Sequence, residues 1–246
     1  MKKFTLLYIA LIVLMASGLS FSQFYVKLGG GYNLGLNPDN LGANSTGGTS
    51  EVTSYEAVNG SFGEGINFSG VLGYELASNL GLELDVIYKL STEFEEKDQY
   101  GSETSTTTMK GSFLAFAPTF VVSAPSQNVS PYAKIGLLIA IPTTEYEFVD
   151  NEGNTGKATF NGGVEFGLAG GAGILVPISS KIDFYAEVDF VSFNWKPDEV
   201  EVTDPDGETE TFKFEDEWTS DDDNTEGPWY IPFSNVGLNV GVQIGL

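Results

Sequence analysis

The C-terminal residues alternate strictly between apolar side chains and small or polar ones. An apolar residue occupies every even position from Val236 to Leu246, and Asn, Gly or Gln occupies every odd position. Successive side chains of a β-strand point to opposite faces, so this period of two predicts a strand with one apolar face. Residues 24–34 alternate in the same way. No stretch after Gln23 keeps a helical apolar period over ten residues, and an all-β fold is therefore predicted.

Six more segments between these two carry strand patterns, which gives eight strands. They are residues 66–76, 80–94, 109–122, 132–147, 158–176 and 182–195. Each is long enough to cross a bilayer as a tilted strand, for which ~9–11 residues suffice.

The connections between these segments alternate between short and long. The short ones are residues 77–79, 123–130 and 177–181, and the long polar ones are 35–65, 95–108, 148–157 and 196–234. Short turns at one end and long loops at the other are typical of an outer-membrane barrel. We therefore predict an eight-stranded antiparallel up-and-down transmembrane β-barrel. Within the last loop, residues 200–203 and 209–214 flank Asp204-Pro-Asp-Gly207 and predict a hairpin.

The first 22 residues have the pattern of a secretory signal peptide. Lys2 and Lys3 precede an apolar run over residues 4–15, and small residues follow up to Ser22. The apolar run is too short for a transmembrane helix, which needs ~20 residues. We predict that residues 1–22 are cleaved and that residues 23–246 form one barrel domain.

The composition excludes several kinds of chemistry. The chain has no Cys and no His, and its 11 basic residues are all Lys, so disulfides, imidazole bases and guanidinium clamps are absent. With 34 acidic residues the net charge is −23, which makes nucleic acid a poor partner. We expect no enzymatic activity and no cofactor.

The less apolar face of the strands decides between a membrane barrel and a soluble one. This face is rich in glycine, as in Gly167, Gly171 and Gly173, whereas a solvated soluble strand prefers Thr, Lys and Glu. Small residues suit the crowded lumen of an eight-stranded barrel. The alternative is a soluble β-barrel exported to the periplasm.

Nine charged residues also fall on this less apolar face. On the opposite, lipid-facing side each would cost up to a few kcal/mol, so we expect them in the lumen as a structural network of ion pairs rather than as a catalytic site. They are Lys27, Glu75, Glu83, Asp85, Lys89, Lys134, Glu165, Glu187 and Asp189. We expect Lys134 to be the central cation. The alternative to a purely structural network is that Glu187 and Asp189 form a catalytic acid–base pair.

Several segments resemble the outer-membrane β-barrel domain family, which includes outer membrane proteins A, X and W. They are Pro131-Tyr-Ala-Lys-Ile-Gly-Leu137, Phe166-Gly-Leu-Ala-Gly-Gly-Ala-Gly173 and the terminal strand 236–246. The resemblance implies a location in the outer membrane of a Gram-negative bacterium, with membrane lipid and the outer-membrane assembly machinery as partners. Many family members end in Phe or Trp, whereas this chain ends in Leu246. We expect a monomer.

The expected function is a non-enzymatic barrel with acidic extracellular loops and a structural or surface-interaction role. Two alternatives remain: a narrow channel for small or hydrophobic solutes, and an adhesin or ligand-binding surface protein. The acidic stretch 198–226, with Trp218, Trp229 and Tyr230 in or next to it, makes divalent cations candidate ligands, although it lacks the Asp-x-Asp-x-Asp-Gly calcium loop.

Overall fold

The computed structural model describes residues 23–47, 52–214 and 230–246. The predicted signal peptide, residues 1–22, lies outside the described residues, as do Trp218, Trp229 and most of the acidic stretch. No helix within the described ranges is long and apolar enough to cross a membrane.

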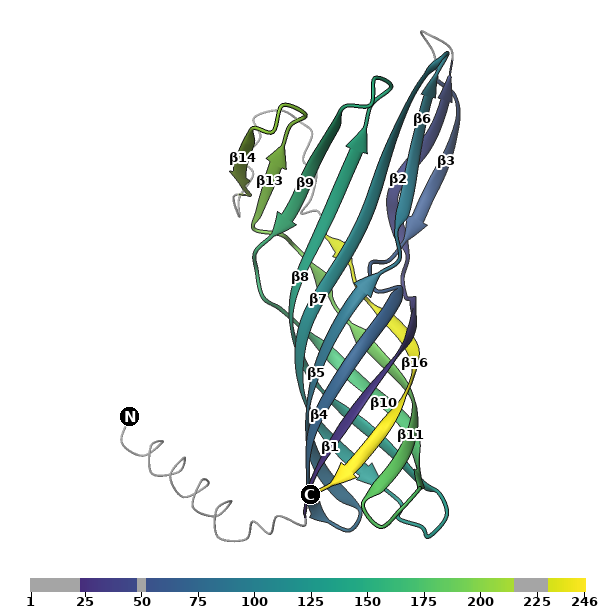
Figure 1. Ribbon diagram of the computed structural model, residues 1–246, viewed down its shortest axis with the longest axis vertical. Helices are drawn as coiled ribbons and strands as arrows, with labels where there is room; N and C mark the ends of the chain where they lie inside the picture. Colours follow the sequence, from purple (N-terminus) through teal and green to yellow (C-terminus); the bar gives the residue numbers. More distant parts are fainter. Residues whose placement is uncertain (1–22, 48–51, 215–229) are drawn as a thin grey trace, which may run out of the picture.

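Eight antiparallel strands form a closed barrel (Figure 1), which confirms the predicted fold class. They are β1 (Phe24–Gly35), β4 (Gly65–Ala77), β5 (Leu80–Ser91), β7 (Glu103–Ser123), β8 (Ser130–Val149), β10 (Glu165–Pro177), β11 (Ile182–Ser192) and β16 (Asn235–Gly245). The ring of strands is closed: β1 pairs with β16, the first and last strands of the chain, and β7 pairs with β8. Closure satisfies the backbone groups that an open sheet would leave unpaired at its edges.

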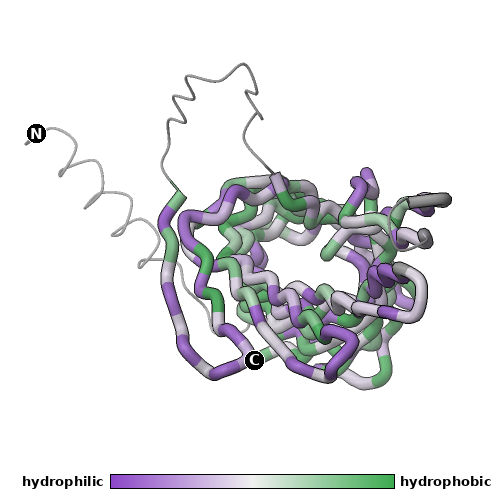
Figure 2. Tube along the Cα trace, turned by 90° about the horizontal axis from the view of Figure 1, so that it is seen from above, coloured by the Kyte–Doolittle hydropathy of each residue, from purple (hydrophilic) through white to green (hydrophobic). Residues whose placement is uncertain are grey.

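The register of the strands keeps all apolar faces on the outside. β1 and β16 pair Leu28 with Val242 and Tyr32 with Leu238, and both members of each pair point outward. Leu137 and Leu238 are 63% and 58% exposed, although they lie mid-strand. Viewed along the barrel axis, hydrophilic and hydrophobic residues alternate along the chain that forms the wall (Figure 2). The outside of the barrel is therefore an apolar belt.

The two ends of the barrel differ strongly. At one end, tight connections join β4 to β5, β7 to β8 and β10 to β11; we call this the short-turn end. At the other, long-loop end, the chain forms further strands: β2 (Asp39–Gly47), β3 (Val52–Gly60), β6 (Phe94–Tyr100), β9 (Thr155–Asn161), β12 (Asn194–Trp195), β13 (Glu199–Thr203), β14 (Thr209–Lys213) and β15 (Ile231–Pro232).

An open sheet rises above the barrel at the long-loop end (Figure 1). β7 has 21 residues and β8 has 20, about twice the length that a bilayer requires. Their upper halves pair with β6 and β9, and the neighbouring strands extend the sheet in the order β14–β13–β9–β8–β7–β6–β2–β3. The predicted hairpin in the last loop is confirmed as β13 and β14.

Three predicted strands are interrupted, and one of them is the segment 182–195, in which β11 ends at Ser192 and Asn194–Trp195 form β12 in a separate sheet with β15. The segment predicted as one strand over residues 158–176 is divided into β9 and β10 at Gly162 and Gly163, which both have positive φ (87° and 78°). Only glycine adopts this conformation readily, and it turns the chain out of the ladder. The segment predicted over 80–94 likewise ends at Ser91, and Phe94 begins β6.

Candidate functional site

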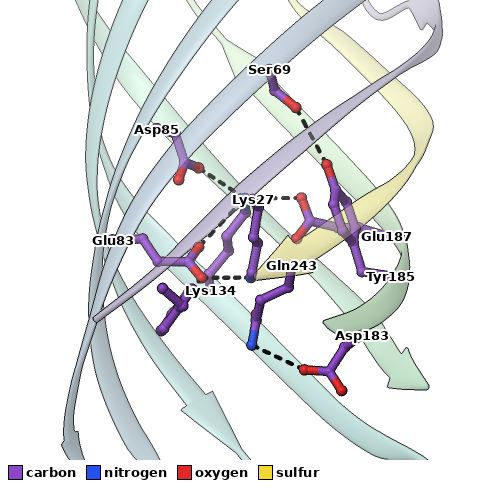
Figure 3. A network of polar contacts seen from close by, with 10 residues as sticks. Lys27, Ser69, Glu83, Asp85, Lys134, Asp183, Tyr185, Glu187 and Gln243 are labelled. Carbon is purple, nitrogen blue, oxygen red and sulfur yellow. Dashed lines mark hydrogen bonds and ion pairs between the residues drawn. The ribbon is translucent and has the colours of Figure 1, made fainter. Parts of the chain in front are cut away.

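The lower half of the lumen holds a layer of buried charges centred on Lys134. Its Nζ lies 2.8 Å from Asp85 Oδ2, 3.0 Å from Glu187 Oε1 and 3.9 Å from Glu83 Oε2 (Figure 3). These residues come from β5, β8 and β11, so the contacts cross the lumen. One ammonium group thus holds three strands of the wall together.

Lys27 of β1 forms the second cationic centre of the layer. Its Nζ lies 2.5 Å from Glu83 Oε1 and 4.4 Å from the centre of the Tyr132 ring, a cation–π distance. The hydroxyl of Tyr25 donates to the same Glu83 oxygen at 2.7 Å. Glu83 therefore lies between Lys27 and Lys134, and one carboxylate links the two cations (Figure 3).

Lys89 and Asp189 lie buried higher in the lumen, next to a cluster of amide side chains. The side chain of Asn33 donates to Asn235 Oδ1 at 2.9 Å and is 3.5 Å from Asp189 Oδ1, and Asn67 donates to Asn33. Lys89 is 1% exposed, and no group in the described ranges lies within hydrogen-bonding distance of its Nζ.

The structure separates two predicted residues from this layer. Glu75 points toward the short-turn mouth, where its side chain is exposed. Glu165 lies half-buried toward the long-loop end and accepts a hydrogen bond from the backbone amide of Lys196 at 3.3 Å. The lumen layer therefore comprises three Lys and four acids among the described residues: Lys27, Lys89, Lys134, Glu83, Asp85, Glu187 and Asp189.

The free space around the charges is small. A cavity of about 20 Å³ is lined by Asp85, Lys134, Glu187 and their neighbours, and a second cavity of about 40 Å³ opens toward the short-turn end beside Tyr25 and Glu75. One water molecule needs ~10–15 Å³ measured in this way, so each cavity accommodates a few waters at most. Lys27 borders both cavities and separates them.

The upper lumen is filled by an apolar plug. Phe62 and Phe233, both 0% exposed, enter from the long-loop end and pack at 5.8 Å from each other. Phe233 also stacks on Phe193 at 5.4 Å and contacts Phe113 at 5.9 Å. Hydrogen bonds hold the two inserted segments together, since Phe62 N donates to Pro232 O at 3.0 Å. Side chains thus fill the lumen at two levels, with apolar groups above and charged groups below.

Sequence reasoning missed the plug. Phe113 and Met109 lie on the inward face of β7, and the alternation of that strand was sufficient to place them there. Phe62 and Phe233 lie in irregular segments without a period, so no sequence signal predicted their insertion. The tyrosines and asparagines of the charged layer, such as Tyr132 and Asn67, could have been found from the inward positions of their strands.

The family of the chain is decided by its match to a sequence family model. The model for the outer membrane protein beta-barrel domain matches residues 4–215. The chain belongs to this family. It is therefore a protein of the Gram-negative outer membrane, in which the apolar belt faces lipid, the short-turn end faces the periplasm and the long-loop end lies outside the cell.

Solved structures of other outer-membrane barrels are similar to this family member. Neisserial surface protein A is 13% identical, with a TM-score of 0.38 over 91% of this chain and 97% of that one. The outer membrane protein OprG from Pseudomonas aeruginosa is 12% identical, with a TM-score of 0.44 over 90% and 94%. Ail, the attachment invasion locus protein of Yersinia pestis, is 13% identical, with a TM-score of 0.34 over 90% and 97%. No curated protein matches the sequence significantly.

Proposed function

We propose that this barrel is a non-enzymatic membrane anchor that holds an acidic sheet at the cell surface, where the sheet contacts molecules outside the cell. The observation that carries the proposal is the double closure of the lumen. Phe62 and Phe233 fill the extracellular half, and the ion pairs of Lys134 cross the periplasmic half. A barrel built in this way offers no continuous aqueous path.

The extracellular sheet supports the interaction role. Its strands and turns carry many acids and few Lys. The acids include Glu95, Glu96, Asp98, Glu103, Glu145, Glu147, Asp150, Glu152, Glu199, Glu201, Asp204, Asp206, Glu208 and Glu210, and the cations include Lys97, Lys110, Lys157 and Lys213. Such a field attracts cationic partners and repels anionic ones. We also propose that the protein is a monomer, and that its partners include outer-membrane lipid and the outer-membrane assembly machinery.

The non-enzymatic part of the proposal rests on the side chains that the chain offers. It contains no His or Cys. Glu187, one half of the candidate acid–base pair, contacts Lys134 at 3.0 Å inside the closed lumen, where a substrate has no access. Within the described ranges, no group of three or more acidic side chains is arranged to hold a metal ion.

Planar-bilayer recordings test the closed lumen. Purified protein inserted into the bilayer should give no stable conductance steps, because an eight-stranded barrel is only wide enough for its own side chains. An open porin added to the same bilayer serves as the positive control, and resistance of the folded barrel to protease confirms insertion. Stable, porin-sized steps from the protein itself would contradict the proposal and support the channel alternative.

A further inference from the structure

One pocket of the extracellular sheet combines aromatic rings with a carboxylate. It is lined by the start of β2 (Asp39, Asn40, Leu41), by Tyr146 of β8, and by Tyr230 with Ile231 and Pro232 of β15. We call it the Tyr146–Tyr230 pocket. It lies outside the lumen layer and directly above the apolar plug, against which its residues Leu41 and Tyr146 pack.

The floor and one wall of the pocket are rigid. Ile231 is 1% exposed, and Leu41 packs against the apolar plug. The ring of Tyr146 is held between Phe62 at 6.3 Å and Phe160 at 5.2 Å. A ligand would therefore meet the Tyr146 side of the pocket without having to order it first, which lowers the entropy cost of binding.

The rim of the pocket is polar and fixed by local hydrogen bonds. Asn40 N donates to Asp39 Oδ1 at 2.9 Å, and Gly42 N donates to Asn40 Oδ1 at 3.0 Å. Asp39 itself is exposed, so its carboxylate is accessible from outside the cell. Tyr230 is 50% exposed and forms the opposite, accessible wall.

The electrostatic environment of the pocket is negative. Burial, and then the charge of Glu96, raise the pKa of Tyr146 to about 12, so its hydroxyl stays protonated at neutral pH. Glu96 is held beside the pocket because its Oε1 accepts a hydrogen bond from Ala43 N at 3.0 Å. Asp39 adds a second negative charge at the rim, and among the described residues no Lys lines the pocket.

The size of the pocket limits the ligand. Its volume is about 30 Å³, room for about two water-sized groups. A pyranose ring is far larger than that, whereas an ammonium group with its adjoining methylene fits. Ammonium groups are also the ligands that tyrosine rings and carboxylates bind together.

We propose that the Tyr146–Tyr230 pocket binds a primary ammonium group presented from outside the cell, as on a lysine side chain of a basic protein or on a free polyamine. The inference rests on the proposed surface-interaction function and names the chemistry of the partner. Asp39 would accept a hydrogen bond from the ammonium, and the two tyrosine rings would contact its methylene and its charge.

Calorimetric titration of the purified protein in nanodiscs of neutral lipid tests this proposal, with tetralysine and spermidine as probes. At least one probe should bind, and the tighter one identifies the source of the ammonium. Asp39→Asn should weaken binding about tenfold, the effect expected for a hydrogen bond to a charged group. Tyr230→Leu should weaken it about two- to fivefold, whereas Tyr230→Phe, which retains the ring, should bind like the parent.

The matched control is Asp206→Asn, which removes the same charge in the β13–β14 turn at the opposite end of the sheet. It should change affinity less than twofold. Equal effects of Asp39→Asn and Asp206→Asn on affinity would overturn the proposed binding site. They would mean that the probes are only attracted non-specifically by the negative charge of the sheet. Failure of both probes to bind, or binding of a neutral oligosaccharide that Tyr230→Leu abolishes, would also overturn it. None of these results would contradict the proposed function as a membrane anchor with a closed lumen. That proposal fails only if the unmodified protein gives stable conductance steps in planar bilayers.

Discussion

Replacing Lys134 by Met should lower the free energy of unfolding by about 3–5 kcal/mol at neutral pH. The Lys134 ammonium lies within 4 Å of three carboxylates, on Glu83, Asp85 and Glu187, which are 4% exposed or less. Met fills a similar volume but leaves these negative charges facing one another where solvent cannot separate them. The loss of the charge, rather than of packing, should therefore dominate.

The pH dependence distinguishes the electrostatic cause from a packing defect. Acid neutralises the carboxylates that Lys134 leaves behind, so the difference in unfolding temperature between Lys134→Met and the parent should shrink as the pH falls. For the same reason, adding Asp85→Asn to Lys134→Met should recover part of the lost stability. Unfolding is followed by the gel shift between heated and unheated samples and by circular dichroism.

Lys110→Met provides the matched control. Lys110 forms an ion pair of similar length, 3.0 Å to Glu145 Oε1, but its side chain is 44% exposed on the outer face of the extracellular sheet. A surface pair of this kind contributes at most ~1 kcal/mol. If Lys134→Met were as stable as Lys110→Met at every pH, the lumen layer would not contribute to stability and its assignment would be wrong.

Introducing a charge on the apolar belt should have the second-largest effect. Val240 lies in the middle of β16, is 45% exposed, and pairs with Gly30 of β1 and Ala186 of β11. Val240→Arg should reduce the stability of the inserted barrel by about 2–4 kcal/mol, because the guanidinium would lie near the bilayer midplane. Folding into lipid vesicles over a urea series measures this difference.

The same substitution outside the membrane serves as its control. Thr211 is exposed on β14 of the extracellular sheet, where an arginine remains solvated. Thr211→Arg should fold into the vesicles with the same urea midpoint as the unmodified protein. Equal midpoints for Val240→Arg and the parent would mean that β16 does not face lipid in the predicted orientation.

Alternation by itself determined which face of each strand points inward. Successive side chains of a strand point to opposite faces. Whether Val240 or Asn239 points inward therefore follows from the residues of that strand alone, without knowledge of its neighbours. The same local rule assigned Lys27, Lys134 and Glu187 to one side. Connection lengths determined the antiparallel order and the two different ends, because short turns can only join neighbouring strands.

Only the tertiary structure decided which inward residues meet. Glu75 and Glu83 have the same parity, yet one reaches the periplasmic mouth and the other contacts Lys27, because the height of a residue depends on strand register and tilt. The break at Gly162 depended on local backbone conformation that the alternating pattern did not reveal.

The plug and the Tyr146–Tyr230 pocket depended on segments far apart in the sequence. Phe62 and Phe233 lie in loops, where no period constrains the direction of a side chain. They enter the lumen because they bury apolar surface there against inward residues such as Phe113. Asp39, Tyr146 and Tyr230 meet for the same reason, since the loop that carries Phe233 is drawn inward beside β2 and β8. Strand periodicity is a local property, so the sequence by itself determined the inward and outward faces, whereas burial of loop side chains is a property of the closed barrel as a whole.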